Sequence, residues 1–218
     1  MHQLRLFDGD GPVRRVLALG AHADDIEIGC GATILALQGT CRLDVTWVVF
    51  AARAERAAEA RASANAFLSG AEERVIECHS LRDGYFPYVG GELKDIFEEM
   101  KRRLDPELIL THTRDDLHQD HRLVCELTWN TWRDHLILEY EIPKYDGDIG
   151  APNVFAPIAE RLAKRKANLI LKSFPTQRDK HWFDEEVFLG LMRLRGVESH
   201  SPTGYAEAFT SRKLSLLT

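Results

Sequence analysis

Short apolar runs alternate with longer amphipathic segments over the first 135 residues. Four of the runs, each bounded by turn-forming or charged residues, predict buried strands. They span residues 13–19, 43–51, 74–78 and 107–111. Four segments with helical spacing or composition predict helices. These span residues 31–38, 53–68, 93–104 and 120–134. Alternation of strands and helices is typical of a parallel sheet that is covered by helices.

The pattern becomes less regular after residue 135. It predicts one further strand over residues 136–141, then a loop, and then helices over 157–172 and 183–194. The chain shows no internal repeat, low-complexity segment or linker. We therefore predict a single domain over residues 1–218. Its fold class is α/β, a Rossmann-like, mostly parallel sheet flanked by helices, with a less regular C-terminal part.

Composition narrows the functional classes. The 218 residues are 44% hydrophobic and 28% charged, with a formal net charge of −6. This composition favours a globular protein and disfavours a nucleic-acid partner, which requires a clustered basic face. No apolar run approaches the roughly 18 residues of a membrane span, and the first residues do not resemble a secretory signal. The four cysteines form no CxxC pair. We expect a cytoplasmic protein.

Histidines and carboxylates gather directly after the predicted strands. Residues 21–25 read AHADD after the first strand, His79 and Asp83 follow the third, and residues 112–121 read HTRDDLHQDH after the fourth. Open parallel α/β sheets bind ligands at the carboxyl ends of their strands. We therefore expect these side chains to converge on one site.

The residue types in this set suit metal-assisted hydrolysis. His22 and Asp25 from one turn, together with His121 from another loop, would form a His₂-Asp site of the kind that catalytic zinc uses. Asp24 cannot point the same way as its neighbour, so it suits the role of general base. His118 lies three residues before His121, a spacing that brings both rings to one side at a helix start. An imidazolium in such a site can stabilise the oxyanion or protonate the leaving nitrogen. Iron or another divalent cation would suit the same donors.

Several of these residues also have ordinary structural interpretations. Asp24 can be a charge at a helix N-terminus, and His118 a surface histidine at a helix start. Asp116 is interpreted as a loop or cap residue. His112 is either part of the site or a histidine held by its neighbours at a strand end. Arg56 lies on an arginine-rich helix and is either a functional residue or part of a solvated face.

Glycines and aromatic residues near the motifs carry further expectations. Gly29 and Gly31 are expected to form a tight turn into the helix over residues 31–38. Tyr85 and Tyr88 either form a platform for a sugar or pack beneath their loop. The segment 139–155 is a candidate for shaping substrate choice.

The two histidine motifs resemble those of one known family. AHADDIEIGCGAT resembles the AHPDDE-type signature of the PIG-L/LmbE-like family, and HQDH resembles its HxDH motif. Weaker similarities follow in family order along nearly the whole chain. They are Glu55-Arg56, Asp83-Gly84, Asp105-Pro106, Thr176-Gln177 and residues 206–209. Ala23 stands where the family has proline, and Ala32 where it has a second glycine.

The resemblance implies a zinc-dependent deacetylase of substrates that contain N-acetylglucosamine, and it implies a role for each matching residue. The metal ligands would be His22, Asp25 and His121. Asp24 would be the general base and His118 the partner of the oxyanion. The sugar contacts would be Arg56 and Asp83. Family members often associate, so a homo-oligomer is expected.

The leading hypothesis is a metal-dependent amidohydrolase that removes the N-acetyl group from an N-acetylglucosamine-type sugar in a glycoconjugate or biosynthetic precursor. One alternative is an amidase that removes a larger acyl group from a glucosamine conjugate. An alternative from another class is a non-hydrolytic nucleotide-binding α/β protein. That alternative is disfavoured because the first loop lacks GxGxxG and places acidic residues where a phosphate would lie.

Overall fold

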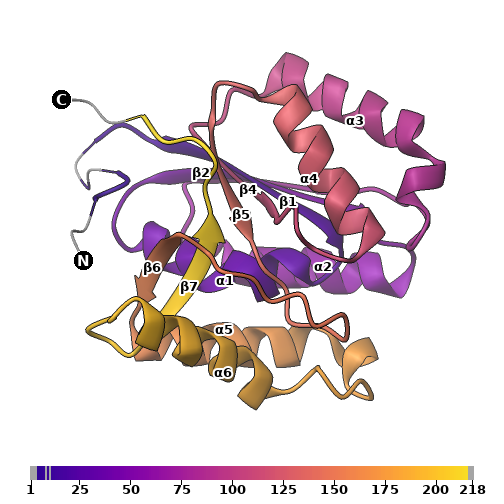
Figure 1. Ribbon diagram of the computed structural model, residues 1–218. Coiled ribbons are helices and arrows are strands. Elements are labelled where there is room, and N and C mark those ends of the chain that lie inside the picture. Colours follow the sequence, from indigo (N-terminus) through magenta and orange to yellow (C-terminus); the bar gives the residue numbers. More distant parts are fainter. Residues whose placement is uncertain (1–3, 8, 10, 216–218) are drawn as a thin grey trace.

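The computed structural model describes residues 4–7, 9 and 11–215 and contains a seven-stranded sheet in the order β3-β2-β1-β4-β5-β7-β6 (Figure 1). The strands are β1 (Arg14–His22), β2 (Leu43–Ala51), β3 (Glu73–Cys78), β4 (Leu108–His112), β5 (Leu136–Tyr140), β6 (Val154–Ile158) and β7 (Tyr205–Thr210). The helices are α1 (Asp25–Gln38), α2 (Glu55–Phe67), α3 (Gly90–Arg103), α4 (Gln119–Thr131), α5 (Glu160–Ser173) and α6 (Glu185–Glu198). Two short 3₁₀ helices lie at Phe86–Tyr88 and Pro175–Gln177.

The strands from β1 to β5 run parallel to one another. β1 pairs with β2 on one side and with β4 on the other, and β5 continues the sheet beyond β4. β7 pairs antiparallel with β5, and β6 pairs antiparallel with β7. The predicted α/β fold class with a mostly parallel sheet is therefore confirmed.

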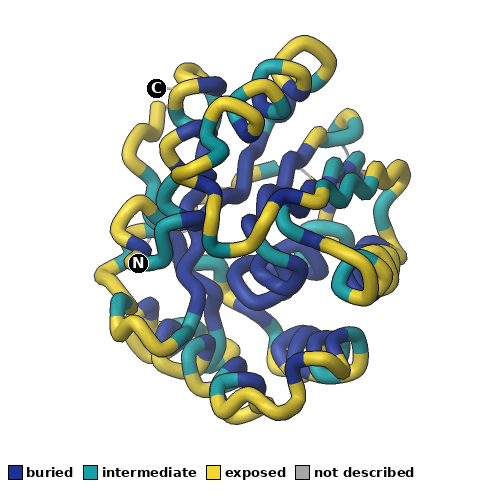
Figure 2. Tube along the Cα trace, turned by 90° about the vertical axis from the view of Figure 1, so that its right-hand side faces the viewer, coloured by how far each residue is buried: buried dark blue, intermediate teal, exposed yellow. Residues whose placement is uncertain are grey.

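Helices cover both faces of the sheet. α3 and α4 lie on one face, α1 and α2 lie on the other, and α5 and α6 form a further layer outside α1 (Figure 1). Side chains alternate along β1, so Val16 and Ala18 pack toward α1 while Leu17 and Leu19 pack toward α3 and α4. The buried strands lie between outer helices that are exposed on one side (Figure 2). No helix in the described part of the chain is long and apolar enough to cross a membrane.

The first helix begins earlier than predicted. α1 starts at Asp25 and not at residue 31, so the expected tight turn at Gly29 and Gly31 is wrong. Both glycines lie inside the helix, where aromatic rings approach its backbone closely. A Cβ at Gly29 would lie 2.1 Å from the ring of Tyr140, and one at Gly31 would lie 2.6 Å from the ring of Phe67. The glycines therefore permit close packing and do not form a turn.

The C-terminal part contributes two strands that the sequence pattern did not predict. Pro157, which was predicted to open a helix, lies in β6, and α5 begins at Glu160. A proline is tolerated here because β6 is at the edge of the described sheet, where a missing N–H breaks no ladder. Both strands are short, and they are extended because β7 pairs with β5 and β6 pairs with β7, not because of their own sequence pattern.

The strand order places a switch point at the centre of the sheet. From β1 the chain passes to β2 and β3 on one side, and β4 then returns to the other side of β1. The loops that follow β1 and β4 therefore begin at this switch point, which is where ligands bind in open α/β sheets. These loops contain the two histidine motifs.

Candidate active site

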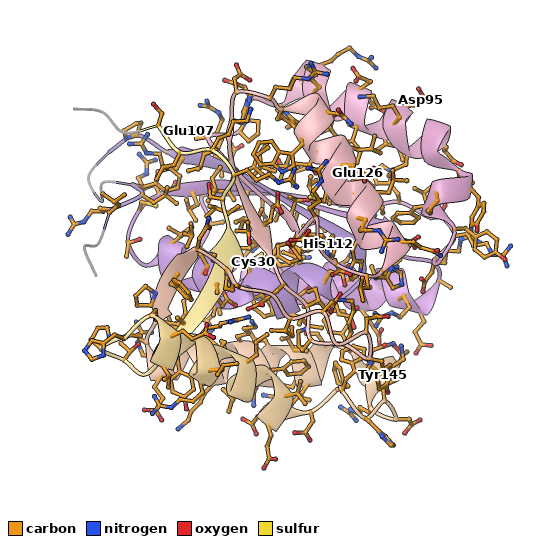
Figure 3. All side chains as sticks on the ribbon, viewed as in Figure 1. Cys30, Asp95, Glu107, His112, Glu126 and Tyr145 are labelled. Carbon is orange, nitrogen blue, oxygen red and sulfur yellow. The ribbon has the colours of Figure 1, made fainter. Side chains whose placement is uncertain are left out.

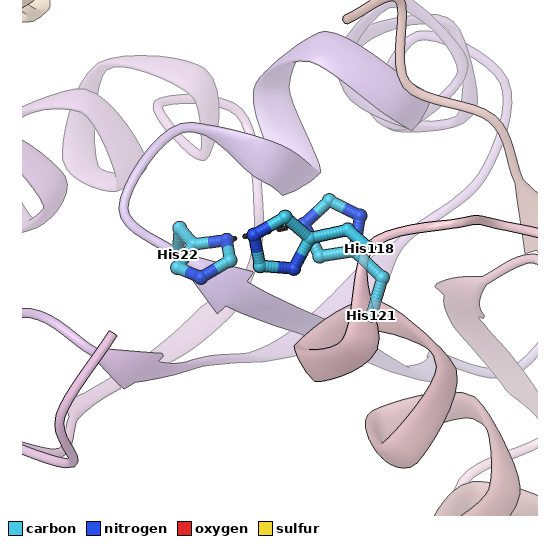
Figure 4. Close-up of side chains that lie close together, drawn as sticks. All are labelled: His22, His118 and His121. Carbon is cyan, nitrogen blue, oxygen red and sulfur yellow. Dashed lines mark hydrogen bonds between the residues drawn. The ribbon is translucent and has the colours of Figure 1, made fainter. Parts of the chain in front are cut away.

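The predicted site residues come from the two loops at the switch point. His22 is the last residue of β1, and Asp25 opens α1. His118 is the N-cap of α4, and His121 lies in its first turn. Figure 4 shows the rings of His22, His118 and His121 close together, with His22 approaching from the opposite side to the other two. The structure thus brings together the residues of both motifs.

Three potential ligand atoms form a compact triangle. His22 Nδ1 lies 3.1 Å from His121 Nε2 and 3.4 Å from Asp25 Oδ2. The third side, from His121 Nε2 to Asp25 Oδ2, measures 3.5 Å. Tetrahedral zinc with bonds of about 2.0–2.1 Å separates its ligand atoms by about 3.4 Å. The predicted ligand set therefore has the spacing and the donor types that zinc requires.

The two histidines of this triangle differ in their affinity for a proton. Burial lowers the pKa of His22, but the surrounding carboxylates, Asp25 first, raise it more, so that its pKa is well above the ordinary value. Burial, followed by the neighbouring His112, lowers the pKa of His121 to about 4. His22 Nδ1 and His121 Nε2 lie within hydrogen-bond distance of each other. A site that attracts a proton in this way suits a cation, whose binding would release that proton.

The outer nitrogens of both histidines contact carboxylates. His121 Nδ1 lies 2.9 Å from Asp116 Oδ2. His22 Nε2 lies 3.0 Å from Asp83 Oδ1 and 3.3 Å from Asp120 Oδ2. Such contacts fix the tautomer of a metal-binding histidine and the orientation of its ring. Each ring can therefore direct its inner nitrogen into the triangle.

Sequence reasoning missed two of these carboxylates. Asp116 caps the N–H of His118 (2.8 Å), as a loop residue would, but it also contacts His121, so the interpretation as only a loop or cap residue is incomplete. Asp120, which the sequence did not single out, is fully buried and accepts hydrogen bonds from the backbone N–H groups of Gly84 and Phe86. Both residues lie inside the histidine-rich segment 112–121, and this position is the signal by which the sequence could have identified them.

Asp24 has one oxygen occupied and one free. Its Oδ1 accepts a hydrogen bond of 2.8 Å from Arg56, whereas the buried Oδ2 has no hydrogen-bond partner in the described part of the chain. Burial raises the pKa of Asp24, and the guanidinium of Arg56 offsets part of that rise. Arg56 also donates to Glu59 (2.9 Å) and to the hydroxyl of Thr176 (3.3 Å). The residue predicted to contact sugar is thus held against the predicted base.

His118 presents a neutral donor to the site. Its Nδ1 accepts a hydrogen bond of 3.3 Å from the backbone N–H of Asp120, so the hydrogen of the neutral ring is on Nε2. Burial, followed by the positive charge of His22, lowers the pKa of His118. The neutral form therefore predominates near pH 7 and still offers an N–H group.

The structure places the undecided His112 in the site. This ring is fully buried and stacks on His121 with centroids 3.9 Å apart. Its Nε2 lies 3.2 Å from Asp25 Oδ2 and 3.0 Å from the backbone nitrogen of Ala21. Figure 3 shows it in the middle of the molecule, next to the sheet. His112 therefore forms the inner wall of the site, behind the ligand triangle.

A comparison with protein families identifies the chain. The family profile described as PIG-L: GlcNAc-PI de-N-acetylase matches residues 17–132. The chain belongs to the PIG-L family. The matched residues include both motifs, so the predicted resemblance is confirmed and a deacetylase is supported. No curated protein sequence matches the chain.

Solved structures of the same fold include enzymes of different activity. GalB, the 4-carboxy-2-hydroxymuconate hydratase from Pseudomonas putida, has a TM-score of 0.74 and 17% identity and covers 94% of this chain and 98% of its own. The conserved protein TT1542 from Thermus thermophilus has a TM-score of 0.74 and 18% identity, with coverage of 93% and 96%. The N,N'-diacetylchitobiose deacetylase from Pyrococcus horikoshii has a TM-score of 0.66 and 21% identity, with coverage of 91% and 83%. At these identities the likeness shows a shared fold and no shared reaction.

Proposed function

We propose that residues 1–218 form one deacetylase domain, a metal-dependent amidohydrolase that removes the N-acetyl group from an N-acetylglucosamine-type sugar in a glycoconjugate or biosynthetic precursor. Membership of the PIG-L family supports this proposal. The observation that carries it is the triangle of His22, Asp25 and His121, together with Asp24 next to Asp25 in the chain, whose Oδ2 has no hydrogen-bond partner among the described residues. A cation site next to an unoccupied basic oxygen is what metal-assisted hydrolysis requires.

His22, Asp25 and His121 would hold Zn²⁺, and Fe²⁺ or another divalent cation would suit the same donors. A divalent cation bound there acidifies water and polarises a carbonyl. The proposal needs no covalent intermediate on the protein. The remaining steps are proton transfers and charge stabilisation by side chains.

Asp24 and His118 divide these tasks. Oδ2 of Asp24 accepts the proton of the attacking water, while the ion pair with Arg56 keeps Oδ1 occupied and the carboxylate in place. His118 donates Nε2–H to the oxygen that becomes negative as the amide carbonyl is attacked. Because the ring is already a neutral donor, this contact requires no change in its protonation.

The mouth of the site offers groups that suit a sugar. The side chain of Asp83 is 75% exposed beside His22 and can accept hydrogen bonds from sugar hydroxyls. Tyr85 and Tyr88 are 40% and 77% exposed, so they do not pack beneath their loop. Apolar faces of sugars stack on such rings. Arg56 is 25% exposed and contributes a second polar contact.

The two alternatives predict different behaviour. An amidase for larger acyl groups would release a bulky acid faster than acetate from otherwise identical glucosamine conjugates. A nucleotide-binding protein would contain little bound metal. Asp24 and Asp25 are both buried at the first turn of α1, where their charges would repel a phosphate. This position favours the cation over the nucleotide.

The decisive assay is a panel of N-acetylglucosamine conjugates, with matched conjugates that carry longer acyl groups, scored for release of free amine. We expect amine release that a chelator abolishes and added Zn²⁺ or Fe²⁺ restores. The panel also includes 4-carboxy-2-hydroxymuconate, because a hydratase shares this fold. Hydration of that compound without amine release from any conjugate would overturn the proposal.

A pair of histidine variants controls for general damage. His121→Ala removes one side of the ligand triangle, so elemental analysis should find the metal lost and the amine assay should find no turnover. His135→Ala changes a histidine just before β5, at the end of the parallel strands opposite to the candidate site. This variant should retain metal and turnover. Full metal content in His121→Ala would refute the ligand assignment.

The binding partner, the cellular location and the oligomeric state are further predictions. We propose a small-molecule amino-sugar conjugate as the binding partner, in keeping with the acetylated sugar named for one structural neighbour. A cytoplasmic location and a homo-oligomer are the expectations from sequence.

A further inference from the structure

A lysine in the loop between β5 and β6 contacts the carboxylate that lies behind the metal-ligand triangle. β4 and β5 are adjacent parallel strands, with His112 opposite Tyr140, so the loops that follow them lie side by side. Lys144, from the second of these loops, places its Nζ 3.0 Å from Asp116 Oδ1 in the first. The side chain of Lys144 is only 12% exposed, and that of Asp116 is 1% exposed. This is a buried contact between two loops and not a surface ion pair.

Asp116 connects Lys144 to His121, because each of its two oxygens faces one of them. Its Oδ1 accepts from Lys144 and from the backbone N–H of His118, while its Oδ2 faces His121 Nδ1 at 2.9 Å. A hydrogen on Nδ1 leaves the lone pair of His121 on Nε2, the atom in the ligand triangle. A buried carboxylate is costly unless it is paired and hydrogen-bonded. The contact with Lys144 therefore holds Asp116 in the position from which its other oxygen orients the ring of His121.

The lysine is itself held on several sides. Lys144 also pairs with Asp148, whose Oδ2 accepts a hydrogen bond of 2.7 Å from the backbone N–H of Leu117. Farther along the loop, Arg195 from α6 bridges Glu141, at 2.7 Å to each carboxylate oxygen, and the backbone oxygen of Gly150 at 2.9 Å. Arg195 thus ties residues on both sides of Lys144 to α6. The lysine itself is held by Asp116 and Asp148.

We propose that Lys144 is a positioning residue for the metal centre, acting through Asp116 on His121, so that the β5–β6 loop sets the affinity of the site for its cation. This inference rests on the metal dependence in the proposed function. It assigns a role to the segment 139–155, for which the sequence pattern suggested only an influence on substrate choice. Lys144 does not touch the triangle itself, so its effect depends on Asp116.

The test is a double-mutant cycle on Zn²⁺ affinity. Metal-free wild type, Lys144→Met, Asp116→Asn and the double variant are titrated with Zn²⁺ against a chromophoric chelator. We expect Asp116→Asn to weaken binding by about tenfold or more, the usual effect of removing a carboxylate behind a metal-binding histidine. We expect Lys144→Met to weaken it by at least about threefold, within the range of couplings between contacting residues. In the Asp116→Asn background, Lys144→Met should have no further effect.

Two controls separate positioning from damage to the fold. Lys94→Met removes a lysine on α3 that pairs with Glu98 along the same helix, and it should leave the Zn²⁺ affinity unchanged. Urea unfolding of the metal-free variants shows whether each is folded at the temperature of titration. If Lys144→Met does not fold, Lys144→Gln, which also removes the ammonium that pairs with Asp116, takes its place in the same cycle.

The outcomes distinguish this inference from the proposed function. Unchanged Zn²⁺ affinity in folded Lys144→Met, or additive losses in the double variant, overturns the inference alone. A raised KM for substrate with unchanged Zn²⁺ affinity also overturns it, because the lysine would then act on substrate. Coupled losses of affinity in a protein that hydrolyses no amide uphold the inference and overturn the proposed function. A wild type that binds no metal overturns both.

Discussion

Two clusters of buried charge are attached to α1, one at its first turn and one at its middle, and they differ in how completely they are satisfied. At the middle, Glu207 accepts hydrogen bonds from the backbone N–H groups of Ala32 and Thr33 and from Lys166, which also donates to the backbone oxygen of Ile28. Both carboxylate oxygens and the ammonium are used within the protein. This cluster joins β7 and α5 to α1.

The cluster at the first turn is incomplete. Oδ2 of Asp24 has no partner in the described residues, and His22 and His121 point ring nitrogens at each other. Buried polar groups are nearly always paired in folded proteins, so those left open call for an explanation. The comparison teaches that burial of charge does not by itself mark a functional site. Buried charged groups whose atoms lack hydrogen-bond partners are the better indication.

Glu27, on the same helix, defines the limit of this rule. Both of its carboxyl oxygens are buried and lack a hydrogen-bond partner in the described part of the chain. Burial raises its pKa well above the ordinary value. Burial raises the pKa of Asp24 as well. Open oxygens therefore indicate a functional site only where, as at Asp24, the neighbouring residues are candidate metal ligands.

The largest effect is expected at the open cluster. Asp24→Asn should lower kcat by about 10²–10⁴-fold, the usual contribution of a general base. The amide cannot accept a proton, although it preserves the shape of the side chain. Steady-state amine release measures kcat, and elemental analysis should find the metal content unchanged.

Asp95→Asn, an exposed carboxylate on α3, is the matched control for this variant and should behave as wild type. Undiminished turnover in Asp24→Asn would show that the free oxygen of Asp24 is not the base. Loss of metal together with turnover would show that Asp24 belongs to the ligand set.

The satisfied cluster should respond in stability and not in catalysis. Lys166→Met leaves Glu207 buried without its cation, which typically costs about 3–5 kcal/mol of unfolding free energy. Urea unfolding measures the loss, and kcat of the folded protein should stay at the wild-type value.

Lys164→Met, two positions earlier on α5, removes an exposed lysine that pairs with Glu160, and it should barely change stability. The comparison between clusters would fail if Lys166→Met reduced kcat as strongly as it reduced stability. Such a result would make the middle of α1 part of the catalytic machinery.

Metal removal should affect stability only through the open cluster. At a free Zn²⁺ concentration about 100 times Kd, binding stabilises the folded state by about 2.7 kcal/mol. Calorimetry of chelator-treated protein, with and without added Zn²⁺, should show a corresponding rise in Tm. Lys166→Met should retain this rise and His121→Ala should lack it. An equal rise in His121→Ala would place the cation elsewhere.

The smallest effect concerns the carboxylate that joins the site to the C-terminal half. Burial raises the pKa of Glu59, but hydrogen bonds from the backbone N–H and hydroxyl of Thr176, and then the contact with Arg56, outweigh it, so that the pKa lies below its ordinary value of 4.5. A lowered folded-state pKa stabilises the protein above pH 4.5, and this contribution is lost as the pH falls through the folded value.

Glu59→Gln should therefore make the unfolding free energy fall less steeply below pH 4.5, by at most about 1.4 kcal/mol per pH unit for one proton. Unfolding in urea at a series of pH values from 3 to 6 measures both slopes. Glu55→Gln, an exposed residue at the start of the same helix, should keep the wild-type slope. Equal slopes for wild type and Glu59→Gln would show that the satisfied carboxylate contributes nothing to acid stability.

Much of the fold was predictable because its first half repeats one local pattern. The strands β1 to β5 are bounded by clear turn signals, and the helices α2, α3 and α4 have helical composition or spacing. β6 and β7 were not predictable in this way. Their sequences, VFAPI and YAEAFT, are short and only partly apolar, and they become strands by pairing at the end of a sheet that already exists.

The candidate site likewise contains residues that the sequence predicts and residues that it does not. His22, Asp25, His118 and His121 were accessible from sequence because each stands in a short motif directly after a strand. Asp116 was visible but ambiguous, since a loop aspartate caps N–H groups in most proteins. Lys144 gave no signal at all, because its partner is far away in the chain.

The sequence by itself determined which chemistry the protein can hold and at which edge of the sheet, since strand periodicity and motif position are local properties of the chain. Only the tertiary structure decided which buried charged groups have hydrogen-bond partners. Both oxygens of Glu207 accept hydrogen bonds, Oδ2 of Asp24 has no partner among the described residues, and Lys144 contacts Asp116. These outcomes depend on distances between elements remote in sequence, and hydrogen bonds form or fail within a few tenths of an ångström.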